Sequence, residues 1–363
     1  MDNTITIDVH AAFMSRALEL ARQGRGKVSP NPMVGCVLVK DGEIIGEGYH
    51  EKFGGAHAEV SACQNARQDP IDSTVYVTLE PCCITGKTPP CTDALIHNSI
   101  SEVYIGMLDP NPEINGKGVE ALKNAGISVH VGIMGEEAEK LNRPFTKWIT
   151  TGMPWVIAKV AQTADGYMGI DSQTSLWLTN RESRGHSHRL RSQVDAILIG
   201  RKTAQVDNPS LTVREVLGNN PKRIILDTNR TLPLNLNIFQ DHEAETIVLC
   251  SESRFNRSRT NACQYIPVKE ENGKLSLKHI LKSLAEEGIL SVLVEGGCEV
   301  LQSFSAADLV DQVYIYTAAH NLENSGMKNP IQLSDEWTVV DEKHLGEDQL
   351  IMAEKGVECL QEL

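Results

Sequence analysis

The chain has 363 residues, of which 41% are hydrophobic and 23% charged, and its formal net charge is −14. This length is more than one ordinary core needs and suits two domains of a globular protein. The acidic balance argues against a nucleic-acid partner, because such binding depends on Lys and Arg neutralising phosphates. No stretch is apolar over enough residues to cross a bilayer, so we expect no membrane partner.

The cysteines and the N-terminal residues bear on the compartment. The chain begins without the basic segment and apolar run that form a secretory signal. Nine cysteines, an odd number, fit reduced thiols better than a disulfide framework. We therefore expect a cytoplasmic protein in which some cysteines are metal ligands.

The first part of the chain alternates short helical and extended patterns. Apolar residues at helical spacing predict a helix over residues 9–22. Asp41-Gly42 is a hairpin turn signal between two strands. The strand before Glu80 delivers Pro81-Cys82 at its end. The expected strands are 34–39, 44–49, 74–79, 103–107 and 127–131, and the expected helices are 57–67, 91–98, 118–124 and about 136–149.

Gly152 and Pro154 mark a boundary, so we expect domains at residues 1–150 and 151–363. After the boundary, strand and helix signals alternate afresh. Such alternation predicts a largely parallel sheet with helices on both faces, which is an α/β fold. The expected strands are 155–160, 196–199, 223–226, 246–249, 291–294 and 312–316, and the expected helices are 183–193, 277–287 and 299–306.

A histidine, a glutamate and two cysteines carry the clearest chemistry. His57, Cys82 and Cys91 supply one imidazole and two thiolates, which are three ligands for a single Zn²⁺. A fourth position left to water is typical of catalytic zinc, and Glu59 can carry the proton of that water. Zinc deaminases acting on pyrimidine or purine rings share this layout. Both metal-binding regions fall at predicted helix starts, where the helix dipole lowers a thiol pKa.

One alternative is a structural zinc site that takes Cys83 as a fourth ligand. Consecutive side chains of an extended segment point to opposite sides, so Cys83 can hardly join Cys82 on one ion. Glu59 would also have no role in such a site. The catalytic interpretation is therefore the stronger one.

Longer segments resemble one family, the bifunctional riboflavin-biosynthesis deaminase–reductases. In the first part these are residues 29–37, 54–60, 78–82 and the loop 86–91, which ends Thr-Pro-Pro-Cys. In the second part they are residues 159–166, 175–179, 188–191, 207–214 and 295–297. The resemblance covers nearly the whole chain.

The resemblance implies a cytidine-deaminase-like α/β/α domain with a mixed sheet, followed by a dihydrofolate-reductase-like α/β domain. It also implies two consecutive steps: deamination of a phosphoribosylaminopyrimidine at zinc, then reduction of its ribose to a ribityl chain by NADPH. The residues it assigns to NADPH are Ala161, Trp177, Thr203, Asp207 and Gly297, and those it assigns to the phosphorylated pyrimidine substrate are Ser175, Arg191, Leu211, Arg214 and Glu295.

Several of these residues could instead have a purely structural role. Arg191 and Arg214 could clamp a phosphate bidentately, but Arg191 could equally lie on a solvated helix face. Trp177 could be core packing. His186 and His188 are expected on a helix surface.

The chain also departs from the family pattern. Cys83-Ile84 stands where Ser-His is common, and the histidine of that pair is associated with substrate. Its role would pass to Thr85 or Lys87. Cys298 stands where a small residue is common.

Other functions are compatible with parts of the pattern. The second domain could be degenerate and reduce nothing. The zinc could be structural in a protein that binds a nucleotide-like ligand without turnover. A polynucleotide deaminase is the third alternative, which the acidic charge disfavours. We expect a homo-oligomer, with a dimer as the working assumption.

Overall fold

The computed structural model describes residues 3–86, 88–169, 178–256, 262–322 and 326–356. The chain divides into two compact units, Met1–Gly152 and Met153–Leu363. Helix α5 (Gly135–Thr151) closes the first unit and is capped by Gly152. The φ of Gly152 is 69°, the left-handed conformation that often ends a helix. Among the helices described, we find none with the length and apolar character to span a membrane.

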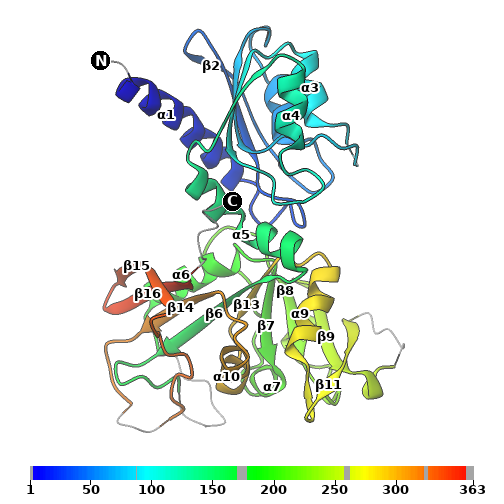
Figure 1. Cartoon of the computed structure of the whole chain (residues 1–363). Helices are drawn as coiled ribbons and strands as arrows, with labels where there is room; N and C mark the ends of the chain where they lie inside the picture. Colours follow the sequence, from blue (N-terminus) through cyan, green and yellow to red (C-terminus); the bar gives the residue numbers. More distant parts are fainter. Residues whose placement is uncertain (1–2, 87, 170–177, 257–261, 323–325, 357–363) are drawn as a thin grey trace. The chain divides into compact units, whose positions relative to one another are not determined.

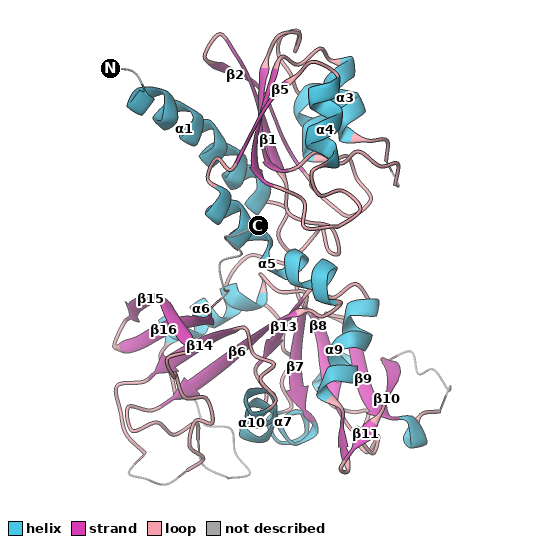
Figure 2. Ribbon diagram, in the orientation of Figure 1, coloured by secondary structure: helices cyan, strands magenta, loops and turns pink. Residues whose placement is uncertain are grey.

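The first unit is a five-stranded mixed sheet between helices (Figures 1 and 2). Its elements are α1 (Asn3–Arg22), β1 (Gly35–Lys40), β2 (Glu43–Tyr49), α2 (Ala58–Gln64), β3 (Thr74–Leu79), α3 (Cys91–His97), β4 (Glu102–Met107), α4 (Lys117–Asn124), β5 (Ser128–Val131) and α5. The strand order is β2-β1-β3-β4-β5, with β3, β4 and β5 parallel. Leu18 and Leu141 pack α1 and α5 on one face, and Ala62, Leu95 and Leu122 pack α2, α3 and α4 on the other.

Two glycines bring helix α2 close to strand β2. A Cβ on Gly48 would lie 2.3 Å from the backbone nitrogen of Ala62, and one on Gly46 would lie 2.4 Å from its oxygen. Any larger residue would force the helix away from the sheet. This packing fixes the helix that carries His57 and Glu59 at its N-terminus.

The second unit is built on a nine-stranded sheet of order β10-β9-β8-β7-β13-β6-β14-β16-β15. The strands from β10 to β14 are parallel, and β16 and β15 join antiparallel. Its elements are β6 (Trp155–Gln162), α6 (Arg181–Arg191), β7 (Ala196–Gly200), α7 (Arg201–Asp207), β8 (Lys222–Leu226), α8 (Asn237–Gln240), β9 (Thr246–Ser251), the 3₁₀ helix η1 (Glu252–Arg254), β10 (Gln264–Val268), β11 (Glu270–Glu271), β12 (Lys274–Leu275), α9 (Leu277–Glu286), β13 (Ser291–Val294), α10 (Cys298–Ala306), β14 (Gln312–Thr317), β15 (Trp337–Leu345) and β16 (Asp348–Lys355).

Apolar cores lie on both faces of this sheet. Leu284 of α9 and Phe304 of α10 pack on one core cluster with Val292 of β13. Leu190 of α6 packs on another with Leu293, the next residue of the same strand. Successive strand residues point to opposite faces, so helices cover both faces as the alternating pattern predicts.

Candidate active sites

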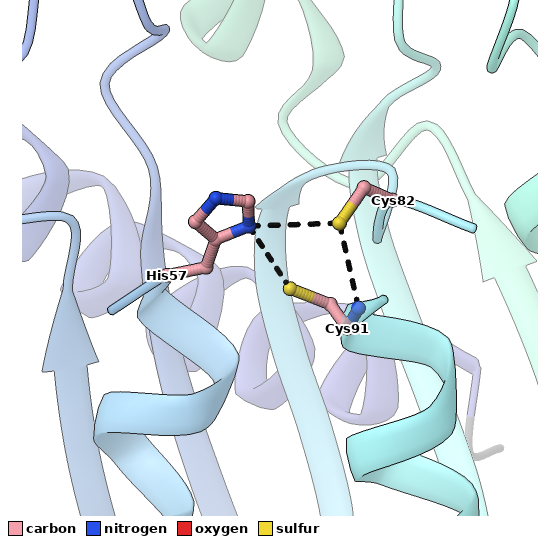
Figure 3. A group of neighbouring side chains, drawn as sticks. All are labelled: His57, Cys82 and Cys91. Carbon is pink, nitrogen blue, oxygen red and sulfur yellow. Dashed lines mark hydrogen bonds between the residues drawn. The ribbon is translucent and has the colours of Figure 1, made fainter. Parts of the chain in front are cut away.

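The three predicted metal ligands meet at one point of the first unit (Figure 3). His57 is the N-cap of α2, Cys91 is the first residue of α3, and Cys82 lies in the loop after β3. The Nδ1 atom of His57 is 3.2 Å from Sγ of Cys91 and 3.5 Å from Sγ of Cys82. Cys82 follows strand β3, as the sequence predicts, and does not itself start a helix. Its sulfur still accepts the backbone N–H of Cys91, at 3.4 Å, at the start of α3.

The geometry of these atoms fits zinc. Bond lengths of about 2.3 Å to sulfur and about 2.0 Å to nitrogen place the two atoms about 3.5 Å apart in a tetrahedral site. The second ring nitrogen of His57 lies 3.3 Å from Oγ1 of Thr88, a contact of the kind that orients metal-binding histidines. The described group that could hold a metal contains His57, Cys82 and Cys91 and does not include Cys83. Three ligands leave one position for water, as catalytic sites do.

The two thiols are electrostatically unequal without a metal. The hydrogen bond from Cys91 lowers the pKa of Cys82 to about 4. The same contact, together with burial, raises the pKa of Cys91. The pair therefore shares one negative charge, and a bound metal ion would deprotonate both thiols.

Glu59 lies in the first turn of α2, where its side chain is 3% exposed and hydrogen-bonded with Cys91. Burial raises the pKa of Glu59 to about 7, and the charge of Cys82 adds to this rise. A carboxyl group with a pKa near neutrality can both take and return a proton. The structure thus places Glu59, the predicted proton carrier, beside the predicted metal ligands.

His50 and its hydrogen-bond partners form a second group of residues beside this site. No local sequence pattern predicts this group. His50 lies edge-on to the ring of His57, with 5.4 Å between centroids. One ring nitrogen of His50 bonds the carbonyl of Ala56, and the other bonds the side-chain amide of Asn31. The partners are separated in the chain, so only the fold shows that they support one another.

Glu80 organises the backbone beside Cys82. Its carboxylate is 2% exposed and accepts N–H bonds from Asp109, Gly116 and Val119. These bonds tie the end of β3 to the loop before α4 and to the first turn of that helix. Asp109 is itself buried, and burial raises its pKa to about 6, with the charge of Glu80 adding to the rise.

Ile84, which stands where the family commonly has a histidine, faces solvent. Ile84 is 40% exposed and Thr85 is exposed, while Lys87 lies outside the described residues. A pyrimidine contact through Thr85 or Lys87 therefore stays a prediction.

The second unit contains a cavity of about 980 Å³ at the carboxyl ends of its parallel strands. Five of the predicted ligand-binding residues line it, and Trp177 and Ser175 lie outside the described residues. Gly297 has a φ of 62° and precedes α10, so backbone amides at this turn can approach a phosphate. The lining residues among those predicted are Ala161, Thr203, Asp207, Glu295 and Gly297.

An ionic cluster lies at one end of this cavity. Arg191 donates to both oxygens of Glu295, at 2.7 and 2.9 Å, and Lys159 lies 3.8 Å from the same carboxylate. Burial alone would raise the pKa of Glu295, but the charges of Arg191 and Lys159 and the hydrogen bonds from Arg191 lower it to about 2. In this structure the guanidinium fork of Arg191 is directed to Glu295, and its predicted contact with a phosphate stays a prediction. The side chain of Arg191 is 14% exposed, so it does not lie on a solvated helix face.

Two other predicted substrate residues, Leu211 and Arg214, are not among the residues that line the cavity. Leu211 is 4% exposed within an apolar core cluster, with a φ of 55°. The backbone N–H of Arg214 donates to Nδ1 of His188, at 3.0 Å. His188 is buried, so the surface position expected for it is wrong. His186 is half-buried and bonds the hydroxyl of Tyr316.

The sequence and structure are similar to those of known proteins. Residues 7–107 match the cytidine and deoxycytidylate deaminase zinc-binding region, and residues 154–326 match the RibD C-terminal domain. Riboflavin biosynthesis protein RibD of Aquifex aeolicus is 43% identical over 314 residues, which is 86% of this chain and 87% of that protein. The Escherichia coli RibD protein is 38% identical over 320 residues, 84% of this chain and 86% of its own.

A solved structure from Thermotoga maritima is similar throughout. It is a diaminohydroxyphosphoribosylaminopyrimidine deaminase/5-amino-6-(5-phosphoribosylamino)uracil reductase, 36% identical, with a TM-score of 0.88. The match covers 97% of this chain and 100% of that one. Acinetobacter baumannii RibD is 34% identical, with a TM-score of 0.87 over 96% of this chain and 99% of its own.

The fold, the sites and these similarities define a two-part enzyme, a zinc-dependent deaminase joined to an NADPH-dependent reductase. The chain belongs to the RibD family of bifunctional riboflavin-biosynthesis enzymes. The family, the fold class and the two cofactors predicted from the sequence are thereby confirmed. The roles of individual site residues stay predictions.

Proposed function

We propose that residues 1–150 deaminate 2,5-diamino-6-(5-phosphoribosylamino)pyrimidin-4-one. Residues 151–363 then reduce the ribosyl group of 5-amino-6-(5-phosphoribosylamino)uracil with hydride from NADPH. The observation that carries the first step is the convergence of His57, Cys82 and Cys91 beside the buried Glu59. The reduction step is supported by the cavity along the ends of the parallel strands, which is large enough for a dinucleotide.

In the deaminase unit, His57, Cys82 and Cys91 would hold zinc, and Glu59 would move the protons. Bound zinc supplies a water that is acidic near neutral pH. Glu59 would take one proton from this water as the oxygen attacks the ring carbon that bears the amino group, and would give that proton to the ring nitrogen. It would then carry the second proton of the same oxygen to the amino group, which leaves as ammonia.

In the reductase unit, Ala161, Thr203, Asp207 and Gly297 would hold NADPH together with Trp177. Ser175, Arg191, Leu211, Arg214 and Glu295 would serve the phosphorylated substrate. Because its pKa is low, Glu295 is ionised and would repel a phosphate. Its carboxylate therefore suits the hydroxyl groups of the ribosyl chain, and Arg191 acts by holding it in place.

The net charge of −14 argues against a nucleic-acid partner and is compatible with a small phosphorylated substrate held in a local basic pocket. We also propose a cytoplasmic enzyme that forms a homo-oligomer, with a dimer as the simplest closed assembly. Analytical ultracentrifugation of the purified protein tests the dimer.

The purified protein tests both activities together. It receives the phosphoribosylaminopyrimidine and NADPH, with and without a zinc chelator, and ammonia release and NADPH oxidation are followed. We expect both signals without chelator, and neither with it. Deaminated product supplied to the chelated enzyme should restore NADPH oxidation. Ammonia release without NADPH oxidation would instead mean that the second unit is degenerate.

A further inference from the structure

Two residues of helix α6 hold the backbone of the loop that carries Arg214. Nδ1 of His188 accepts the backbone N–H of Arg214 at 3.0 Å, and Nη1 of Arg191 donates to the carbonyl of Thr212 at 3.3 Å. Residues three apart lie on the same face of a helix, so one face of α6 supplies both bonds. The helix is itself fixed to the sheet, because Leu190, between the two, is 3% exposed within a core cluster.

This loop has a backbone conformation that needs outside support. Leu211 has a φ of 55°, a left-handed value that is strongly disfavoured for a bulky side chain. The side chain of Leu211 packs in an apolar cluster, and Thr212 next to it is buried. Strained residues of this kind persist only where the surrounding structure holds them, and they gather at ligand-binding sites. The bonds from α6 therefore keep residues 211–214 in an arrangement that the loop would not adopt by itself.

His188 can accept this bond only while Nδ1 carries no proton, which means in the neutral form of the imidazole. His188 is 6% exposed, and burial lowers its pKa from the ordinary value of 6.5. The charges of Arg191 and Arg214 lower this pKa further, and the carboxylates of Glu295 and Glu215 oppose the shift only in part. At pH 7 His188 is therefore a neutral acceptor between two cations.

The guanidinium group of Arg214 is the more accessible of the two arginines assigned to the substrate. Arg191 is directed to Glu295, whereas Arg214 is exposed and its Nη1 contacts Oγ1 of Thr212 at 3.3 Å. A guanidinium group binds a phosphate through a planar fork of donors, so its direction matters as much as its charge. That direction depends on the backbone from which the side chain extends.

We propose that His188 is a positioning residue of the reductase site, whose neutral imidazole fixes the backbone of Arg214 so that the guanidinium group is directed at the phosphate of the pyrimidine substrate. His188 acts through Arg214 and makes no contact with the substrate itself. The inference rests on the reductase function proposed above.

Steady-state kinetics of the full-length protein, given deaminated product and NADPH, test this role with two opposite substitutions. His188→Asn removes most of the ring but keeps an acceptor, Oδ1, at the position of Nδ1. His188→Leu fills the space but leaves the N–H of Arg214 without this partner. The KM for deaminated product should rise about tenfold in His188→Leu, because losing one such bond changes a binding constant by about that factor. It should rise less than about threefold in His188→Asn, and the KM for NADPH should be unchanged in both. A role in packing alone predicts the reverse order, because only His188→Asn leaves a cavity.

A double-mutant cycle with Arg214→Ala shows whether His188 acts through Arg214. Adding His188→Leu to Arg214→Ala should change the KM for deaminated product less than about twofold, because no guanidinium group is left to direct. Arg189→Ala, at an exposed position of the same helix, is the control and should keep the wild-type KM.

Three results would overturn the proposal: a wild-type KM in His188→Leu, a tenfold rise in His188→Asn, or losses that multiply in the double variant. Failure of the wild type to oxidise NADPH with deaminated product would instead count against the reductase function, which separates the two hypotheses.

Discussion

Glu59 and the thiols of Cys82 and Cys91 form one buried electrostatic unit. The carboxyl group and the two thiols perturb one another's pKa values, and burial keeps water from screening them. A zinc ion would neutralise the thiolates and leave Glu59 as the group that exchanges protons. Loss of the Glu59 carboxyl group should therefore impair deamination much more than it impairs zinc binding.

Glu59→Gln separates these two roles. The amide keeps the size of the side chain but cannot accept a proton, so ammonia release should fall by about 10²- to 10⁴-fold. Zinc content, measured by atomic emission, should stay at one ion per chain, because the three ligands are intact. Glu51→Gln, at an exposed position of the same unit, serves as the control. Retained ammonia release in the Glu59 variant would refute the proton-carrier role.

Glu295 gives a prediction about pH and stability. Its pKa in the folded protein is about 2, against an ordinary value of 4.5, because the opposing charges of Arg191 and Lys159 outweigh burial. A lowered folded pKa stabilises the protein above pH 4.5, and this contribution is lost as the pH falls from about 4.5 toward 2. Wild-type protein should therefore lose its stability advantage over Glu295→Gln within that window.

Hydrogen exchange in β13, the strand just before Glu295, reports the opening free energy of this region. The difference in opening free energy between wild type and variant should be constant from pH 7 to pH 5. It should become smaller between pH 4.5 and pH 3. Other carboxyl groups titrate in both proteins and cancel in the comparison. A gap that is the same at pH 3 and pH 7 would show that Glu295 is not held ionised by its partners.

The helices, strands and turns whose positions are determined by nearby sequence patterns could be predicted. The Asp41-Gly42 turn has both residues at positive φ, 52° and 80°, as the two-residue hairpin requires. The strand β3 and the start of α3 lie where the sequence places them, so the metal ligands could be predicted to converge. Helix α1 begins at Asn3 and not at residue 9, because end positions carry little periodic signal.

Elements that depend on distant partners could not be predicted in this way. Strand β15 is an edge strand with mostly exposed residues, so its sequence lacks the alternation that marks a half-buried strand. The pairing of Arg191 with Glu295 joins α6 to the end of β13, and the strongly polar sequence of α6 gives no hint of it. The same holds for His50 and Asn31 at the metal site.

Helix α5 supports the deaminase site through Asn142. This side chain is 1% exposed, accepts the N–H of Met33 at 2.9 Å and donates to its carbonyl at 2.9 Å. The same loop presents Asn31 to His50. Asn142→Ala would leave both backbone groups of Met33 without this partner, so the loop should lose its position.

Deaminase activity of Asn142→Ala should fall roughly tenfold, a typical effect for residues that support metal ligands. NADPH oxidation with deaminated product should be unchanged, since Asn142 belongs to the first unit. Glu139→Ala, an exposed position on the same helix, is the control. A variant that loses both activities together would point to general unfolding and not to the loop.

At the scale of the whole molecule, the two units have separate cores. The clusters around Leu18 and Leu95 lie entirely before Gly152, and those around Leu284, Leu190 and Phe239 lie entirely after it. Because a domain with its own core can in principle fold alone, each unit should carry its activity independently.

Fragments 1–152 and 153–363, expressed separately, test this independence. The first should bind zinc and release ammonia, and the second should oxidise NADPH when given deaminated product. The first fragment should lose activity to a chelator, and the second should not, because the described metal ligands all lie before Gly152. Mixing the fragments should then reproduce the two-step conversion at a rate set by the slower one. If a folded fragment is inactive alone but recovers on mixing, its site needs residues from the other unit, and the assignment of one activity to each domain fails.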